Sequence, residues 1–215
     1  MAAESDLLEL LQQPSVVVAP RLLGAVVRHR SADGTVAVRL TEVEAYMGPA
    51  DSAAPDPGSH SYRGKTPRNT TMFGPAGHFY VYFTYGMHYC ANLVCSPAGT
   101  SSGCLLRAGE VVEGIGIARA RRPAARRDKE LAQGPARLAT ALAMGREHNG
   151  AWALGGDFSV ELASALAPDD ILTGPRVGLG GPGGSASYPW RYWIAADPTV
   201  SRYKPAVVRK RPAVS

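Results

Sequence analysis

The sequence predicts an α+β fold arranged around an antiparallel β-sheet. Strand-like segments come first, helix-like segments follow, and further strand-like segments end the chain, which is an order typical of that class. Short turn sequences join neighbouring strands and favour antiparallel pairing. The 215 residues suffice for one domain with its own core, and we see no repeat or internal linker. We expect a single domain over residues 1–203 and a basic, disordered tail over residues 204–215.

The first expected elements are a short helix and a strand hairpin. Residues 5–12 have the amphipathic spacing of a helix that begins at Ser5 or Asp6 and ends before Pro14. Residues 21–30 and 35–46 indicate two strands, because Asp33 and Gly34 between them form a typical turn pair. Residues 47–77 are rich in Pro, Gly, Ser and Asp, and we expect a long functional loop there.

The second half supplies another hairpin, two helices and further strands. β-branched and aromatic residues on both sides of Gly86 indicate a hairpin over residues 78–95, followed by a strand over residues 103–111. Residues 110–122 and 134–144 have the pattern of helices, the second with Pro135 in its first turn and Gly145 after its end. A Gly-rich loop and a strand over residues 190–195 come last.

Charge, hydropathy and cysteine content indicate which classes of protein the chain can belong to. The net charge is +5, and arginines cluster at residues 119–127, which is typical either of a polyanion binder or of a solvated basic loop. The N-terminal residues do not resemble a signal peptide, and no run of about 18 apolar residues occurs, so we expect a soluble cytoplasmic protein without membrane association. Three cysteines, an odd number, favour reduced thiols over a disulfide framework.

Two carboxylates end the strand expected at residues 35–46. Counting at the strand period of two places Glu42 and Glu44 on the face of three apolar side chains, which are Val36, Val38 and Leu40. A carboxylate on a core-facing register is costly unless it is paired. Each is therefore expected to pair with a cation or to perform acid/base chemistry, and spacing alone does not separate the two roles.

Six segments in order give the chain a resemblance to the alkyladenine (3-methyladenine) DNA glycosylase family. They are EAYMGP at 44–49, RGKTPRN at 63–69, MF at 72–73, YVYFTYGMHYCAN at 80–92, LLRAGEVVEG at 105–114 and QGPARLATALAM at 133–144. Their order and spacing extend the resemblance from about residue 15 to residue 203. The segment before His60 is longer than the family's usual connection.

The resemblance implies a monofunctional DNA glycosylase with a curved antiparallel sheet, surrounding helices and a protruding β-hairpin. Such an enzyme flips alkylated or deaminated purines, such as 3-methyladenine and hypoxanthine, out of double-stranded DNA. It hydrolyses the N-glycosidic bond with a Glu-activated water and leaves an abasic site for base excision repair. We expect a monomer in the cytoplasm, at the nucleoid if the source is bacterial, that needs neither a cofactor nor a metal.

Catalytic roles follow from the same resemblance. Glu44 matches the general base, which leaves Glu42 for a structural ion pair. His60 and Arg107 match the residues that hold the attacking water, with the carbonyl of Val177 as a weaker candidate.

Binding roles are implied as well. Tyr46 and Tyr82 match the aromatics that stack on the flipped base, with His60 completing the cage on the Tyr46 side, and their faces would favour a cationic purine. Asn92 matches the residue at the base edge, where it disfavours the amino group of guanine. Tyr85 matches the residue that intercalates into DNA.

The segment RGKTPRN is expected to contact the DNA backbone through Arg63, Lys65 and Arg68. An enzyme with lyase activity needs an amine nucleophile. We see no lysine near the six segments except Lys65, so we expect water to be the nucleophile.

Three other interpretations are weaker. Structural zinc is disfavoured because the candidate ligands contain no Cys-x-x-Cys pair; they are His88, Cys90, Cys95 and Cys104. The Gly-rich residues 177–184 lack the flanking strand and helix of a dinucleotide loop. A catalytically silent nucleic-acid-binding module on the same fold is the serious alternative, although such a module would have no need of Glu44.

Overall fold

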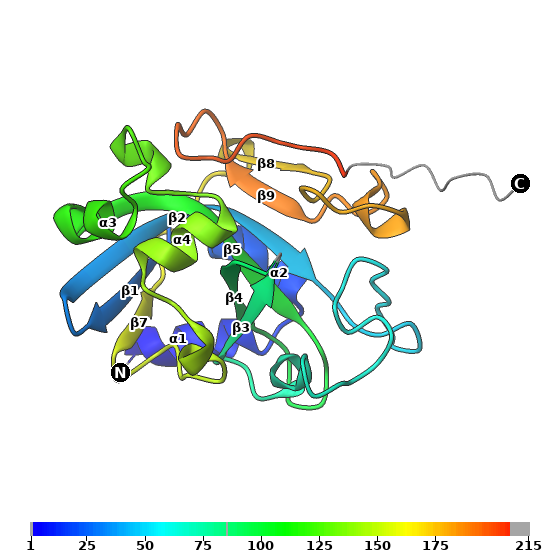
Figure 1. Ribbon diagram of the computed structural model, residues 1–215. Helices are drawn as coiled ribbons and strands as arrows, with labels where there is room; N and C mark the ends of the chain where they lie inside the picture. Colours follow the sequence, from blue (N-terminus) through cyan, green and yellow to red (C-terminus); the bar gives the residue numbers. More distant parts are fainter. Residues whose placement is uncertain (1, 85, 207–215) are drawn as a thin grey trace, which may run out of the picture.

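The computed structural model describes residues 2–84 and 86–206 (Figure 1). These residues form one domain with four α-helices and a nine-stranded antiparallel sheet, which confirms the α+β class. Tyr85 and residues 207–215 of the expected tail lie outside the described residues. None of the helices within the described ranges is long and apolar enough to cross a membrane.

The sheet has six strands on its main path, in the order β3-β4-β5-β2-β1-β7. Their bounds are Phe79–Thr84 (β3), His88–Val94 (β4), Gly103–Glu113 (β5), Gly34–Tyr46 (β2), Val26–Ser31 (β1) and Phe158–Glu161 (β7). Three short strands extend it: β6 (Ala132–Gln133) on β5, β9 (Arg191–Ile194) on the end of β2, and β8 (Ile171–Gly174) on β9. The central pair is β2 and β5.

A β-bulge changes the face that β2 presents to the main core. The core-facing side chains are Val36, Val38 and Leu40 before the bulge, and Val43 and Ala45 after it. The register with β5 shifts between Leu40 and Glu42 and again between Glu42 and Val43, and a bulge of this kind bends the strand and re-aims its side chains. Glu42 and Glu44 therefore lie on the opposite face, and the expectation that they share the face of Val36 is wrong.

Four helices pack around the sheet. Their bounds are Ala2–Leu11 (α1), Ser15–Arg21 (α2), Ile115–Arg121 (α3) and Pro135–Ala141 (α4). The second helix packs on β2 through buried Val18 and Ala19, and α4 packs on β4 and β5. The pattern of the sequence did not predict α2, because three consecutive valines favour a strand and Pro20 normally interrupts a helix.

Several predicted boundaries are corrected. The first helix begins at Ala2, before Ser5. The strand β1 begins at Val26 rather than residue 21. Residues 110–113 belong to β5, and α3 starts only after Gly114, whose φ of 72° needs the left-handed region that glycine tolerates. The residue that turns the chain after α4 is Ala143, with φ 51°, rather than Gly145.

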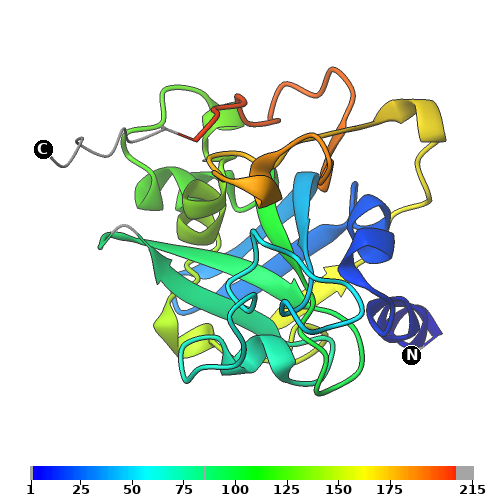
Figure 2. The ribbon, with the colours of Figure 1, turned by 90° about the vertical axis from the view of Figure 1, so that its right-hand side faces the viewer.

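The predicted long loop and hairpin are both present. Residues 47–77 contain only a 3₁₀ turn at Thr70–Phe73 and an isolated bridge between Gly48 and Pro55. Strands β3 and β4 pair from Phe79 and Leu93 up to Thr84 and His88. Figure 2 shows the long loop, in cyan, in front of the sheet beside this hairpin. The three cysteines are free thiols, as predicted.

Candidate active site

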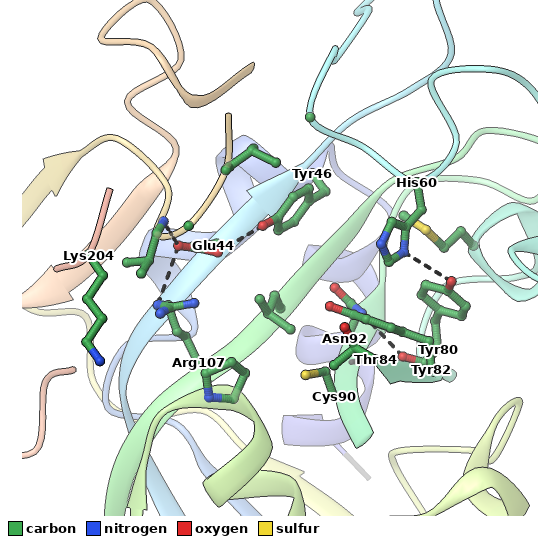
Figure 3. Close-up of a pocket in the computed structure, with 17 residues that line it drawn as sticks. Glu44, Tyr46, His60, Tyr80, Tyr82, Thr84, Cys90, Asn92, Arg107 and Lys204 are labelled. Carbon is green, nitrogen blue, oxygen red and sulfur yellow. Dashed lines mark hydrogen bonds and ion pairs between the residues drawn. The ribbon is translucent and has the colours of Figure 1, made fainter. Parts of the chain in front are cut away.

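A cavity of about 400 Å³ lies on the face of the sheet opposite the main core. Side chains alternate between the two faces on each strand. The core side takes Phe79, Val81, Ala91, Leu93, Cys104 and Leu106, and the cavity side takes Tyr80, Tyr82, Cys90, Asn92, Leu105 and Arg107. The end of β2 adds Glu44 and Tyr46, while His60 comes from the long loop and Val177 from the Gly-rich segment. Figure 3 shows Glu44 and Arg107 on one side of this cavity and His60, Tyr80 and Tyr82 on the other.

Glu44 is fully buried, and three groups orient its carboxylate. Oε1 accepts a hydrogen bond from the backbone N–H of Val177 at 2.7 Å and lies 3.4 Å from Arg107 Nε. Oε2 accepts a hydrogen bond from the Tyr46 hydroxyl at 2.9 Å. A carboxylate oxygen can accept more than one hydrogen bond, so Oε2 retains a lone pair for a further donor such as water. The backbone of Val177 thus contacts Glu44 through its N–H, whereas the sequence had suggested its carbonyl as a water ligand.

Glu42 is the centre of a separate buried ion-pair network. Its Oε1 accepts hydrogen bonds from Arg107 Nε at 2.8 Å and Arg191 Nε at 2.6 Å, and its Oε2 accepts one from the backbone N–H of Ser201 at 2.7 Å. The structural ion pair predicted for Glu42 is therefore confirmed. Arg107 touches both carboxylates. Burial alone would lower the pKa of this guanidinium, but Glu44 and Glu42 outweigh that effect and raise the pKa, so Arg107 stays charged.

Three tyrosines and His60 form the aromatic part of the cavity. Burial raises the pKa values of Tyr46 and Tyr82, so both stay neutral. His60 Nδ1 lies 3.2 Å from the Tyr80 hydroxyl, and its ring meets Tyr82 edge-on at 4.6 Å. Burial, and then the charge of Arg68, lower the pKa of His60, so its ring is neutral near pH 7. The sequence placed His60 on the Tyr46 side, but its ring contacts are with Tyr80 and Tyr82.

Polar side chains of β4 complete the floor of the cavity. Asn92 is buried and donates a hydrogen bond from Nδ2 to the Tyr80 carbonyl at 3.3 Å, so its amide orientation is fixed. Cys90 lies beside Tyr82, and burial raises the pKa of its thiol to about 11. A thiol with that pKa is a poor nucleophile near pH 7.

Arg176, Asp56 and Arg191 are buried charged residues that the sequence did not single out. Arg176 and Asp56 form a bidentate ion pair with both bonds at 2.6 Å, and both side chains are completely buried. The guanidinium of Arg176 lies 4.5 Å from the centre of the Tyr46 ring. The two partners are 120 residues apart in the chain, so no local pattern of the sequence could have suggested this pair.

Residues expected at the DNA backbone lie outside the cavity. Arg68 donates a hydrogen bond to the Phe83 carbonyl on the hairpin at 3.3 Å, and Lys65 Nζ lies 5.6 Å from the centre of the Phe73 ring. Arg63 is exposed in the same loop. A second lysine does approach the site: Lys204 lines the cavity, and its carbonyl accepts a hydrogen bond from Gly178 N–H at 2.8 Å. The expectation that Lys65 is the single lysine near the site is therefore wrong.

The basic cluster at residues 119–127 is largely engaged within the protein. Arg119 pairs with Asp128, Arg121 with Asp33, and Arg127 with Glu130. Among the described residues, no group of three or more His, Cys, Asp or Glu side chains is arranged to hold a metal ion.

Comparisons with known proteins agree with this arrangement. The sequence model of the family described as Methylpurine-DNA glycosylase (MPG) matches residues 9–198. A protein of Streptomyces avermitilis is 52% identical over 206 residues, which cover 94% of this chain and 93% of the relative. A protein of Leifsonia xyli subsp. xyli is 53% identical over 194 residues, 88% of each chain. A protein of Corynebacterium glutamicum is 46% identical over 189 residues, 88% of this chain and 93% of the relative. All three carry the name "Putative 3-methyladenine DNA glycosylase".

Proposed function

Because this chain belongs to the methylpurine-DNA glycosylase family, whose members hydrolyse N-glycosyl bonds in DNA, we propose that it releases 3-methyladenine and related alkylated or deaminated purines, including hypoxanthine, from double-stranded DNA. The observation that carries the mechanism is the buried carboxylate of Glu44, which lines the cavity and whose Oε2 can accept another hydrogen bond beside the one from Tyr46. The target nucleotide must leave the duplex to reach it.

Glu44 acts as the general base in this proposal. The bond between C1′ and the purine breaks with its electron pair going to the purine, and the sugar develops oxocarbenium character. Water bound to Glu44 Oε2 attacks C1′ and gives a proton to the carboxylate. Arg107 and the Val177 N–H fix the other carboxylate oxygen, so the base is held on one side of the sugar. A cationic purine leaves as a neutral base, whereas hypoxanthine leaves as an anion and takes up a proton from solvent, and the other product is an abasic site.

The aromatic side chains bind the flipped purine by stacking. Tyr46 approaches from the strand that carries Glu44, while Tyr82 approaches from the hairpin with His60 at its edge. A neutral His60 adds no charge that would repel a cationic lesion. Asn92 lies on the same face of the sheet, two residues along β4 from Cys90, where its fixed amide would clash with the 2-amino group of guanine.

DNA contacts come from the loop and the hairpin. Arg63, Lys65 and Arg68 lie in the loop beside the hairpin and would contact phosphates, which are the usual partners of exposed basic side chains. Tyr85, outside the described residues, follows β3 in sequence and is proposed as the wedge that fills the vacated position in the duplex. The exposed side chains Phe83 and Met87 near this position suit contact with DNA. We further propose that the protein acts as a monomer in the cytoplasm.

The decisive experiment compares base release by wild type and Glu44→Gln. Single-turnover release of hypoxanthine and of 3-methyladenine is measured on duplexes, with alkali treatment to reveal abasic sites. The variant should lose about 10²-fold to 10⁴-fold in rate, as expected for loss of a general base, and should keep its affinity for the duplex. Glu110→Gln, which changes an exposed carboxylate on β5, is the matched control and should keep the wild-type rate.

The alternative is a silent nucleic-acid-binding module. No observation in the cavity favours it, because the three groups that orient Glu44 would serve no purpose in binding DNA. Wild type that binds the duplexes but releases no base from any lesion would overturn the proposed hydrolase and support this alternative.

A further inference from the structure

Two loops meet at the rim of the cavity through one buried ion pair. We call residues 55–61 the His60 loop and residues 175–184 the Val177 loop. Asp56 and Arg176 join them across 120 residues of sequence, with Arg176 Nη1 and Nη2 each 2.6 Å from a carboxylate oxygen. Both side chains are completely buried. The planar fork of an arginine fixes orientation as well as distance.

Arg176 also holds the end of β2. Its Nη1 donates a hydrogen bond to the carbonyl of Ala45 at 2.9 Å, and Ala45 lies directly between Glu44 and Tyr46. Its guanidinium stacks on the Tyr46 ring at 4.5 Å and on the Trp190 ring at 5.2 Å. Arg176 does not line the cavity although Tyr46 does, so the guanidinium covers the ring face that points away from the cavity.

The carboxylate of Asp56 accepts four hydrogen bonds. Besides the two bonds from Arg176, its Oδ2 accepts a hydrogen bond from Met47 N–H at 3.0 Å and its Oδ1 accepts one from Gly58 N–H at 2.8 Å. The carboxylate therefore connects the residue after Tyr46 with the His60 loop. Arg176 Nη2 continues this connection to the carbonyl of Gly183 at 2.8 Å.

The backbone shows that the two loops fit together without spare room. A Cβ atom on Gly183 would lie 2.4 Å from the backbone N of Gly58, and a Cβ on Gly58 would lie 2.6 Å from Arg176 Nη2. Contacts this short exclude any larger residue unless the loops move apart. The close approach of Gly183 to the Gly58 backbone involves neither side chain of the ion pair, and it fixes the same junction.

We propose that the Asp56–Arg176 pair is a positioning pair for excision, which clamps the His60 loop to the Val177 loop and thereby sets Glu44 and Tyr46 for catalysis. This inference rests on the proposed function. Arg176 orients Ala45 by its own hydrogen bond, and the next residue, Val177, supplies the N–H that holds Glu44 Oε1. The segment before His60 thus contributes Asp56, which holds the two loops together.

Stability alone does not account for this pair. Replacing a buried ion pair by packed apolar residues is often neutral or favourable, so a buried pair is weak evidence for a stabilising role. What an apolar replacement cannot supply is the set of directed hydrogen bonds to Ala45, Met47, Gly58 and Gly183. The pair should therefore affect the rate of the chemical step more than the binding of DNA.

The test uses Arg176→Lys, Asp56→Glu and Asp56→Asn in the full chain. Arg176→Lys keeps the charge but loses the fork, and Asp56→Glu keeps the charge but moves the carboxylate by one methylene. Single-turnover release of hypoxanthine should slow by about tenfold to a hundredfold, the effect of misplacing a catalytic group by roughly 1 Å. The dissociation constant for a duplex with a tetrahydrofuran abasic analogue should change by less than about threefold, because the phosphate contacts are untouched.

Arg121→Lys is the matched control, because Arg121 is also a largely buried arginine with several hydrogen bonds, to Asp33, Ser31 and the Ala141 carbonyl. All variants are assayed well below their melting temperatures. Arg121→Lys should keep the wild-type rate even if its melting temperature falls as far as that of Arg176→Lys. Asp56→Asn leaves Arg176 as a buried charge without its partner and is the variant most prone to misfold. If it misfolds, Arg176→Lys and Asp56→Glu, which keep the charges, still test the positioning role.

The possible outcomes separate the two proposals. Wild-type rates in folded Arg176→Lys and Asp56→Glu, beside an active wild type, would overturn the positioning role and leave the proposed function intact. A loss of rate in Arg121→Lys equal to that in Arg176→Lys would also overturn it, because replacing a buried arginine away from the cavity would then slow excision as much. An inactive wild type would reject the proposed function and the positioning role together.

Discussion

At the scale of single residues, Tyr46 and Tyr82, the two rings proposed to stack on the purine, differ in their electrostatic surroundings. The outer face of Tyr46 already carries the guanidinium of Arg176, whereas no cation–π contact involves Tyr82 among the described residues. A cation on one face of a ring draws on the same negative charge that would attract a second cation on the other face. Attraction of a positively charged purine should therefore depend mainly on Tyr82.

The difference between the two rings can be tested by the ratio of the release rates of 3-methyladenine and hypoxanthine. Tyr82→Leu should lower the release of 3-methyladenine relative to hypoxanthine by about fivefold, the equivalent of ~1 kcal/mol of cation–π attraction. Tyr46→Leu should slow both lesions by similar factors, because it removes stacking and the hydrogen bond to Glu44. Single-turnover rates on the two lesions measure the ratio, and an equal fall of the ratio in both variants would contradict the argument.

A trapping experiment with a Lys204 variant tests whether water or a lysine amine is the nucleophile. The position of Lys204 at the cavity supplies an amine that the sequence did not indicate, whereas the proposed mechanism has Glu44 activate water. Incubation of wild type with a hypoxanthine duplex and borohydride should trap no covalent complex, because no Schiff base forms. Lys204→Ala should excise the base with less than about a tenfold loss. Trapping that disappears in Lys204→Ala would instead show lyase chemistry.

At the scale of elements, the bulge in β2 explains where sequence reasoning about the site failed. Period-two counting placed Glu42 and Glu44 with Leu40, whereas the register shifts against β5 move them to the cavity face. The residue types still indicated that one carboxylate would be paired, and Glu42 is. The motifs indicated the chemistry of Glu44, but a single inserted residue in a ladder leaves no reliable mark in the hydrophobic pattern.

The close approach of Gly109 on β5 to β2 predicts how a substitution there changes the free energy of unfolding. A Cβ on Gly109 of β5 would lie 2.4 Å from the Arg39 carbonyl and from Val38 Cγ1, so the central strands could not keep their separation. Gly109→Ala should lower the free energy of unfolding by about 1–3 kcal/mol, the usual cost of overpacking. Gly116→Ala in α3, where a Cβ would meet nothing within 4 Å, should be neutral or slightly stabilising. Urea unfolding of both variants measures the difference.

The β3–β4 hairpin carries the proposed wedge. Tyr85→Ala should slow base release from duplex DNA by about 10-fold or more, because unstacking costs a few kcal/mol that a wedge helps to offset. Release from a single-stranded oligonucleotide with the same lesion should change far less, since no base stack has to be opened on a complementary strand. Equal losses on both substrates would assign Tyr85 to the pocket instead of the duplex.

At the scale of the whole molecule, two partly desolvated histidines, the exposed His60 and the half-buried His148, predict how stability depends on pH. Burial lowers the pKa values of both His60 and His148 below the ordinary 6.5. Above pH 6.5 these histidines are neutral in the folded and the unfolded chain, so their contribution is complete. As the pH falls below 6.5, the unfolded chain binds protons first, and stability is lost until the folded pKa values are passed.

Urea unfolding at pH 7.5, 6.0 and 5.0 tests this direction. The free energy of unfolding should fall across the series, and the fall should be smaller in His60→Gln, which cannot titrate. Ordinary carboxylates do not titrate strongly in this range, so they contribute little to the slope. A free energy that stays constant from pH 7.5 to 5.0 would contradict the burial effect on these rings.

The fold was more predictable than the site. The pattern of β-branched and aromatic residues identifies β2, β3, β4 and β5, and short turns mark the β1–β2 and β3–β4 hairpins. The helix α2 escaped detection because packing of Val18 overrides a strand-like composition. The pairs of Arg176 with Asp56 and of Arg191 with Glu42 could not be predicted, since they join positions 120 and 149 residues apart and leave no local pattern.

The wide sequence separation of the contacts around Glu42 and Glu44 has a consequence for synthesis. A ribosome releases the chain from its N-terminus, so both carboxylates emerge long before their partners. Val177 follows Glu44 by 133 residues, and Ser201 follows Glu42 by 159. A nascent chain can complete most of its sheet while the acids still lack those donors. Repair activity is thus the last property the polypeptide acquires, and a product that terminates before β9 leaves Glu42 without Arg191 and Ser201.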